Sequence, residues 1–191
     1  ATGGVDEESD AALYARYHDR RTLPITSGNK NHYIMWATET AGVGYASCVP
    51  LWNGNGTVKV VIAGEDRGPV DEVIRSACAA HIEAERPIGA TVTVVSVRER
   101  EIPLTAKVTL MPGHTTEQVG DQVEAAVNEL LKKRTFGEAA TIPYSRFLAC
   151  LLQCPGVADY SELTVDGSGK AVTLDAEDAA VVGTITITET A

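Results

Sequence analysis

Two pairs of residues in this chain carry side chains that commonly bind zinc. Cys78 and His81 lie three positions apart, and Cys150 and Cys154 lie four positions apart, each pair in a segment expected to be helical. Together they offer the thiolates and the imidazole of a tetrahedral site. Structural zinc sites usually place paired cysteines in loops, and neither pair matches that spacing. We therefore predict no metal and no other cofactor, with His81 as a partly buried polar residue at the edge of a core.

A glycine-rich run has part of the composition of a phosphate-binding loop. Residues 167–170 read Gly-Ser-Gly-Lys, which is similar to the end of a P-loop. Ala171 follows where that motif needs Ser or Thr, and Thr164 stands where it needs its first glycine. The run also lies between two expected strands, so no helix N-terminus would face a phosphate. We interpret it as a hairpin turn.

The remaining titratable residues form no recognisable catalytic motif. His18, His32 and His114 are scattered, and the sequence has no Gly-x-Ser-x-Gly nucleophile motif. Acidic pairs such as Glu7-Glu8 and Glu65-Asp66 lie at expected helix starts or turns, where carboxylates are solvated. Two carboxylates act as acid and base only where a cleft separates their pKa values. We predict a protein that is not an enzyme, with no catalytic residues and no small-molecule substrate.

The composition is that of an acidic globular protein. The 191 residues are 44% hydrophobic and 22% charged, which suits one large or two small domains with their own cores. Only 5% are aromatic, so the cores must consist mainly of Val, Ile, Leu and Ala. A net charge of −10 opposes binding to nucleic acid, which needs Lys and Arg to neutralise phosphates. We interpret the basic run 132–134 as a partner of a helix dipole.

The chain has no obvious targeting or membrane segment. No apolar run approaches the roughly 18 residues of a membrane span, and no signal peptide is recognisable. The chain begins without Met in polar sequence, so we expect a fragment or a processed product. Cys150 and Cys154 would have Cβ atoms about 5–6 Å apart on a helix, beyond the ~3.8 Å of a disulfide. The cysteines, which include Cys48, are therefore expected to be free and mostly buried.

Helical and strand patterns alternate in the first half of the chain. Pro69 suits a first helical position, and the Asn-Gly-Asn-Gly run at 53–56 is a strong hairpin signal. We expect helices over about 9–21, 29–40 and 69–84, and strands near 43–50, 57–63 and 91–97.

The second half contains the clearest alternation. Apolar residues at every second position from Ile102 to Leu110 predict a strand with one buried face, which should face the next helix. Thr115 and Gln118 form a capping box at the start of that helix, whose apolar face is formed by Val119, Val123, Val127 and Leu130. The expected elements are strands over 102–110, 157–165, 171–174 and 181–188, and helices over about 115–134 and from Pro143 to Pro155.

These elements predict an α+β fold made of two small α/β modules, each a short sheet covered by helices. We place the N-terminal helical-hairpin module at residues 1–98 and the C-terminal module at residues 99–191. In each half a helix is followed by a Gly-Val corner, at Gly42-Val43 and Gly156-Val157, and then by two strands. A weak internal repeat would explain this order, and so would a common way of linking such elements.

The order and spacing of several segments resemble the C-terminal part of the baseplate J-like family. The resemblance covers nearly the whole chain and is clearest over residues 1–97. It rests on the opening segment Thr2 to Asp10, Gly28-Asn29, Tyr33, Trp36, Gly42-Val43-Gly44, the run from Pro50 to Val58, and Arg86 to Ala90 followed by a Val/Thr-rich strand.

The resemblance implies a structural role in the baseplate of a contractile phage tail or a prophage-derived or tail-like injection machine. The expected partners are other baseplate proteins and copies of the chain itself, and the expected location is the virion tail baseplate after synthesis in the bacterial cytoplasm. The alternatives are an enzyme or metal-binding domain of unknown chemistry, and a tail-associated module that binds the host.

An assembly role directs attention to aromatic and apolar residues, because aromatic side chains are enriched in interface cores. With few aromatic residues available, each is individually better explained as part of a core. We expect the N-terminal helix in particular to form contacts with other proteins. The candidate interface residues are Leu13, Tyr14, Tyr17, Trp36 and Trp52.

Overall fold

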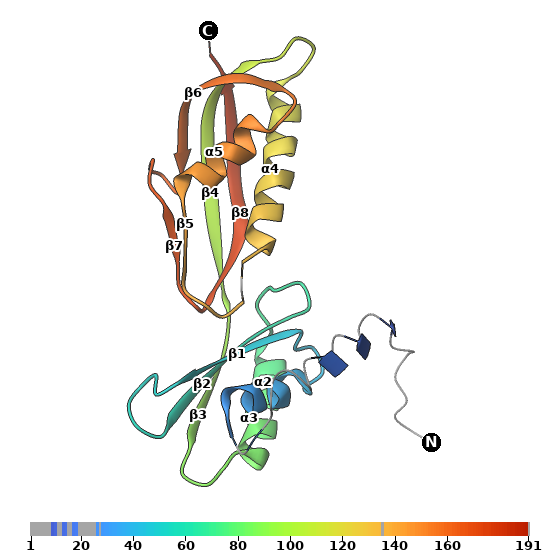
Figure 1. Cartoon of the computed structure of the whole chain (residues 1–191), viewed down its shortest axis with the longest axis vertical. Coiled ribbons are helices and arrows are strands. Elements are labelled where there is room, and N and C mark those ends of the chain that lie inside the picture. Colours follow the sequence, from blue (N-terminus) through green and yellow to red (C-terminus); the bar gives the residue numbers. More distant parts are fainter. Residues whose placement is uncertain are drawn as a thin grey trace.

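The computed structural model describes residues 9–10, 13–14, 17–18, 26, 28–134 and 136–190. Two parts lie end to end along the longest axis of the molecule, and the chain passes from one to the other where β3 runs into β4 (Figure 1). We call residues 28–96 the first module and residues 98–190 the second module. The expected α+β architecture with two sheet modules is confirmed.

The first module is a three-stranded sheet with two described helices on one face (Figure 1). β1 and β2 form the expected antiparallel hairpin. β2 and β3 pair in parallel, and the chain between them contains one helix. The elements are α2 (Lys30–Thr38), β1 (Tyr45–Pro50), β2 (Thr57–Ala63), α3 (Glu72–Glu85) and β3 (Thr91–Ser96).

Capping residues decide where the helices of the first module begin. The side chain of Asn29 accepts a hydrogen bond from His32 N (2.9 Å), so α2 starts within a residue of its expected position. The expected start of α3 at Pro69 is wrong. The carboxylate of Asp71 accepts a hydrogen bond from Ile74 N (2.8 Å), and this cap starts the helix at Glu72.

The second module is built around one long central strand. β4 pairs antiparallel with β6 and parallel with β8, in the order β6-β4-β8, and a smaller two-stranded sheet joins β5 to β7. The elements are β4 (Arg98–Leu110), α4 (Thr116–Lys132), β5 (Ala140–Ile142), α5 (Tyr144–Leu152), β6 (Val157–Val165), β7 (Val172–Leu174) and β8 (Asp178–Glu189).

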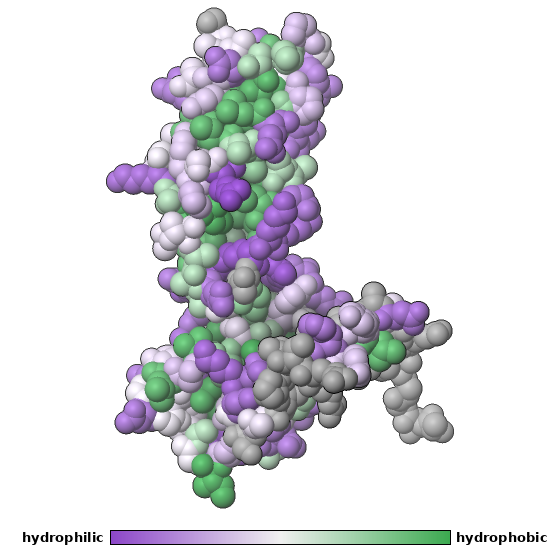
Figure 2. All heavy atoms as spheres, viewed as in Figure 1, coloured by the Kyte–Doolittle hydropathy of each residue, from purple (hydrophilic) through white to green (hydrophobic). Residues whose placement is uncertain are grey.

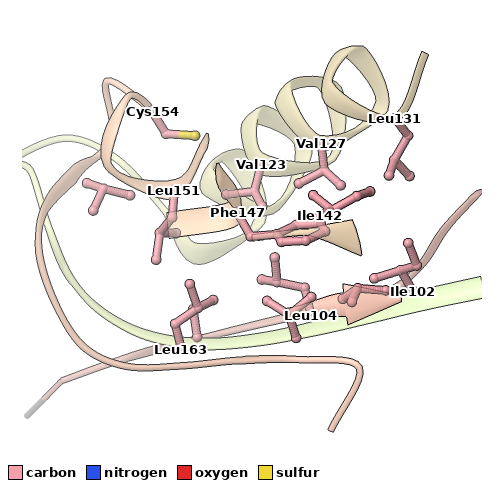
Figure 3. Close-up of a cluster of buried hydrophobic side chains, with 14 of the residues drawn as sticks. Ile102, Leu104, Val123, Val127, Leu131, Ile142, Phe147, Leu151, Cys154 and Leu163 are labelled. Carbon is pink, nitrogen blue, oxygen red and sulfur yellow. The ribbon is translucent and has the colours of Figure 1, made fainter. Parts of the chain in front are cut away.

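The core of the second module confirms the register predicted for β4. Its apolar residues from Ile102 to Val108 are buried, whereas Thr105 and Lys107 are exposed. Figure 3 shows Phe147 of α5 between β4 and the inner face of α4. The capping box of Thr115 and Gln118 is present, and the buried face of α4 consists of Val119, Val123, Val127 and Leu131. Leu131, not Leu130, ends this face.

Strand pairing in the second module departs from the predictions in two ways. β5 was not predicted, because three residues are too few for a periodic pattern. β7 pairs with β5, so the expected hairpin between 157–165 and 171–174 is wrong. The two halves therefore share an order of elements without sharing strand pairing, which favours common linkage over an internal repeat.

Candidate assembly surfaces

The residues that could bind zinc lie in two different cores. Cys78 is buried in the first module, and its sulfur lies 4.0 Å from Ala37 O. His81 instead has Nε2 2.9 Å from Glu39 Oε2, and Cys150 and Cys154 belong to the second module. Within the described ranges no group of three or more His, Cys, Asp or Glu residues is placed to hold a metal.

Burial makes the thiols poor nucleophiles. It raises the pKa of Cys48 from its ordinary value near 9 to about 11, and it also raises the pKa of Cys78, Cys150 and Cys154. The thiolate is the reactive form, so burial lowers the reactivity of these side chains. All four are free cysteines.

The run 167–170 is part of a closed turn, although the strands on either side of it do not pair as the hairpin interpretation expected. Asp166 and Gly167 have φ values of 52° and 70°, as a tight turn requires. Val165 and Ser168 exchange backbone hydrogen bonds of 2.8 and 3.0 Å across the turn. The chain continues into β7 rather than into a helix, so the geometry of a phosphate-binding loop is missing at this place.

The N-terminal candidates are exposed. Leu13, Tyr14 and Tyr17 are helical, and each has about half or more of its side chain accessible to solvent. Most of the expected helix over 9–21 lies outside the described residues. All three side chains are therefore accessible at the surface.

Trp36 and Trp52 have different environments. Trp36 is only 5% exposed, stacks on His32 with ring centroids 3.8 Å apart, and meets Tyr33 edge to face at 5.2 Å. This burial assigns Trp36 to the core, which corrects its place among the interface candidates. Trp52 is 40% exposed. Lys59 Nζ lies 4.1 Å from the centroid of its indole ring, so a cation–π contact orients the Trp52 side chain.

Three exposed large apolar side chains lie in two turns of the first module, and Figure 2 shows separate apolar spots on this part of the molecule. We call Leu51, Trp52 and Ile88 the tip patch. Leu51 is 62% exposed and Ile88 is fully exposed. The turns that carry them are neighbours, because Thr91 N donates to Gly56 O (2.7 Å) where β2 and β3 begin to pair. The tip patch therefore combines residues about 36 positions apart in sequence.

Leu51 has a backbone conformation that is unfavourable for its type. Its φ is 58°, in the left-handed region that costs roughly 1 kcal/mol for a residue with a Cβ. The hydrogen bond from Leu51 N to Thr57 O (2.7 Å) holds this conformation at the end of the hairpin. Sequence reasoning missed Leu51 and Ile88, because a single apolar residue in a turn carries no periodic signal. The combination of strain and exposure makes this turn a candidate contact surface.

The second face of the first sheet packs against the second module. Successive strand residues point to opposite faces, so Val60 and Ile62 face the helices while Val61 and Ala63 face the other way. Val61 and Ala63 form a small cluster with residues of both modules, which we call the module junction: Tyr45, Val95, Val97, Phe136 and Ala179. Lys59, on the same face as Val61, forms a 2.6 Å ion pair with Glu177 of the second module.

Arg67 joins the first module to the end of α4. Its Nη1 donates to Lys132 O (2.9 Å) and Arg134 O (3.1 Å), and its guanidinium lies 4.6 Å from the ring centroid of Tyr45. A cation at the last carbonyls of a helix is favourable. The cation expected there was the local run 132–134, but Lys132 pairs with Glu129 (3.0 Å). The first module therefore supplies the charge that meets the C-terminus of α4.

Arg134 holds the loop that follows α4. It donates to the carbonyl oxygens of Asp175 and Asp178 (2.7 Å each) and Glu138 (2.5 Å), and burial lowers the pKa of its guanidinium. The backbone then approaches β1 closely at Gly137, where a Cβ would lie 2.1 Å from the Cβ of Ser47. Only glycine fits this approach, so the loop is matched to the surface of the first module.

Comparison with protein families assigns both modules. The model of the baseplate J-like central domain matches residues 25–96, and the model of the baseplate J-like protein C-terminal domain matches residues 102–188. The chain belongs to the baseplate J-like family. The resemblance noted in the sequence is thereby confirmed.

Individual relatives support the same assignment. The phage-like element PBSX protein XkdT of Bacillus subtilis is 33% identical over 97% of this chain and 55% of its own length. The baseplate protein gp47 of Escherichia phage Mu is 29% identical over 83% of this chain and 46% of its own length. The chain therefore spans about half the length of these relatives.

A solved structure has the same fold. The cryo-EM structure of the anti-feeding prophage baseplate contains a chain that matches 95% of this one with a TM-score of 0.65 and 17% sequence identity, over 43% of that chain. No helix in the described part of this chain is long and apolar enough to cross a membrane.

Proposed function

We propose that this chain is a structural component of the baseplate of a contractile phage tail or a tail-like machine. The observation that carries the proposal is the match of both modules, in order, to the two baseplate J-like domains. The relative in phage Mu is itself named a baseplate protein. On this proposal the chain acts by its shape and its contacts with other proteins.

The proposed partners are other baseplate proteins and further copies of this chain. A closed ring repeats each contact, so individual interfaces can be weak and still hold a stable assembly. The net charge of −10 keeps free subunits apart before assembly. The proposed location is the tail baseplate, reached after synthesis in the bacterial cytoplasm.

Two exposed apolar surfaces are the proposed contact sites. One is the tip patch, and the other is formed by Leu13, Tyr14 and Tyr17. Both include Trp or Tyr side chains, which are enriched among the residues that dominate the affinity of protein interfaces. We propose that both are covered in the assembled baseplate.

We propose further that the chain acts without catalysis. The burial of the four thiols and the closed turn at 167–170 support this proposal, because these features leave no activated nucleophile and no phosphate cradle at the places that the sequence suggested. The separation of the cysteine pairs into two cores weighs against a shared metal site.

Particles from the producing cell test the structural role directly. The full-length protein should be detected by mass spectrometry in purified tails, at a fixed ratio to the other baseplate proteins. Deletion of its gene should give tails without complete baseplates in electron micrographs, and a plasmid copy should restore them. Normal baseplates in the deletion strain would disprove the proposal.

A matched pair of substitutions tests the tip patch. Ile88→Lys places a charge in the patch, and Val73→Lys places the same charge on an exposed position of α3 outside it. Because both side chains are exposed, both variants should keep the melting temperature of the parent within about 2 °C. We expect only Ile88→Lys to lower incorporation into tails, by about tenfold, when each variant competes with wild-type protein. Equal incorporation of the two variants would remove the tip patch from the interface.

A further inference from the structure

Among the described residues, no strand pairs with the outer edge of β8, the last strand of the larger sheet in the second module. β8 is the last strand in the order β6-β4-β8, and its register with β4 is uninterrupted from Leu104↔Ile185 to Val108↔Glu189. Thr190 N donates to Val108 O (2.8 Å). Because the N–H and C=O groups of consecutive strand residues point to opposite edges, those of Ile185 and Ile187 point away from β4. They form a row of hydrogen-bonding groups along the free edge.

From Ile185 to Thr188 this edge lacks the features that usually keep strands apart, because the register shift between β8 and β4 lies before Ile185, opposite Pro103. Residues 179–188 contain no charged residue and no proline. The opposite edge of the sheet is protected, because β6 carries Asp159 and Glu162 and its pairing with β4 is interrupted by two register shifts. Natural proteins usually protect open edges with charges, prolines or bulges. The difference between the two edges indicates that β8 is paired in the functional state.

A groove of about 400 Å³ runs beside this edge, between β8 and the first half of α4. Its apolar side is formed by Ile185 and Ile187. Gly120 of α4 lies opposite, where a Cβ would be 4.0 Å from Ile187 Cγ1, so the absence of a side chain at Gly120 keeps the groove wide. Three exposed carboxylates of α4 form the rest of the rim: Glu117, Asp121 and Glu124.

The charge of the groove is uncompensated. None of the three carboxylates forms an ion pair with a described residue, and the described lining of the groove contains no Lys or Arg. Carboxylates that lie within a turn or two of each other on one helix repel, so a cation placed among them is attracted. The groove therefore complements a segment that is apolar toward Ile185 and Ile187 and basic toward α4.

We infer that the edge of β8 receives an extended segment of a different polypeptide, which adds to the sheet as a fourth strand and presents Lys or Arg to the carboxylates of α4. Main-chain hydrogen bonds to Ile185 and Ile187 would supply affinity, and the acidic rim would supply specificity. The inference rests on the proposed baseplate role for the source of the segment, which would be another protein of the assembly.

A second copy of this chain does not suit the site. Two copies paired edge to edge across a two-fold axis would each bring an acidic rim to the same place, and like charges facing each other destabilise an interface. The basic run 132–134 lies at and beyond the end of α4, where Arg134 is held by backbone carbonyls. It offers no free extended strand.

Peptide binding to the purified protein tests the edge without particles. The probes are acetyl-Lys-Val-Lys-Val-Thr-Val-Lys-amide and the same peptide with Glu in place of Lys. We expect the Lys peptide to shift the amide NMR signals of Ile185 and Ile187 and to slow their hydrogen exchange at least tenfold. The Glu peptide should do neither. Identical responses to the two peptides would overturn the inference, and so would the absence of any response.

Two lysine substitutions at the rim give the matched control. The double variant Asp121→Lys with Glu124→Lys should bind the Lys peptide at least tenfold more weakly, because it reverses two charges of the rim. Glu65→Lys with Glu85→Lys changes the net charge equally at exposed positions of the first module and should leave binding unchanged. Loss of binding in both variants would show that net charge causes the effect, and would overturn the inference that the peptide binds at this groove.

Cross-linking in particles then identifies the occupant. A photo-reactive residue at position 121 of the full-length protein should form an adduct with a different polypeptide, within a segment that contains Lys or Arg. Adducts only between two copies of this chain would overturn the inference. If the protein is absent from the particles, the baseplate proposal fails. The peptide experiment alone then tests whether the edge of β8 binds an extended segment.

Discussion

At the scale of single residues, Leu51 combines features that rarely occur together. Its side chain is exposed and its backbone is left-handed, so neither burial nor local conformation favours leucine at this position. The hairpin would close as well with glycine there. A residue that costs stability in the isolated chain is explained if it acts in the assembly.

Leu51→Gly separates these two effects. Removal of the left-handed strain should keep the free energy of unfolding within about 1 kcal/mol of the parent, or raise it, although a partly exposed leucine is lost. Incorporation into tails should fall, because the tip patch loses one of its three side chains. Urea denaturation measures the first quantity and competition with wild-type protein measures the second. A variant that is strongly destabilised would show that Leu51 acts in folding.

Cys48 gives the protein a defined sensitivity to alkaline pH. Burial raises the pKa of its thiol from near 9 to about 11, so the folded state holds the proton more tightly than the unfolded state. The resulting stability is fully present below about pH 9 and is lost as pH rises through about 11. Two pH units correspond to roughly 2–3 kcal/mol.

The measurement is the free energy of unfolding from pH 8 to pH 11, compared between the parent and Cys48→Ala. Other groups titrate in this range in both proteins, so the difference between the two curves isolates Cys48. We expect the parent to lose more stability than the variant above pH 9. Parallel curves would show that the thiol gains no protection from its burial.

At the scale of elements, α4 depends on its inner face. Val123 is fully buried against the core of the second module, so Val123→Asp would bury an unpaired carboxylate and should cost about 3–5 kcal/mol. Lys132 is exposed and pairs only with Glu129, so Lys132→Ala should cost under about 1 kcal/mol. Thermal denaturation compares the two. Similar shifts would contradict the assignment of the buried face.

The elements that sequence predicted well are those determined by local patterns. The strict alternation from Ile102 to Val108 determines both the strand and its buried face, and the Thr115 and Gln118 capping box determines where α4 begins. The Asn-Gly-Asn-Gly run likewise predicted the β1–β2 hairpin.

The predictions that failed depended on distant partners. Pairing of β7 with β5 brings together segments about 30 residues apart, and three-residue β5 carries no pattern of its own. Arg67 reaches a helix end more than 60 residues away, in place of the basic residues near that end. The tip patch and the open edge of β8 follow from sheet topology, which no local sequence pattern encodes.

At the scale of the whole molecule, the module junction determines whether the two modules unfold together or separately. The proposed division into residues 1–98 and 99–191 stays a prediction, supported by the separation of the sheets at Val97. Across that division run an ion pair, a small apolar cluster and the hydrogen bonds of Arg67. We expect these contacts to make the modules unfold together.

Arg67→Ala tests this coupling. The variant loses two charge-assisted hydrogen bonds, one to the last residue of α4 and one to Arg134 just beyond it, while the left-handed backbone stays strained, so it should cost about 1–3 kcal/mol. Amide exchange should also rise at the end of α4. Arg146→Ala, at an exposed position of α5, serves as the control and should change both quantities little. Unaltered exchange in Arg67→Ala would mean that the modules are coupled by other contacts.

The parallel pairing of β4 and β8 has a mechanical consequence. Both strands begin beside the first module, at Arg98↔Asp178, and both end at the far end of the second module, at Val108↔Glu189. A pull between β3 and the end of β8 therefore acts on the two strands in opposite directions along their shared ladder. Its hydrogen bonds are loaded in shear and resist together, whereas a pull across the ladder would break them one at a time. We therefore expect the molecule to resist stretching along its long axis, because tension between its two ends loads the β4–β8 ladder in shear.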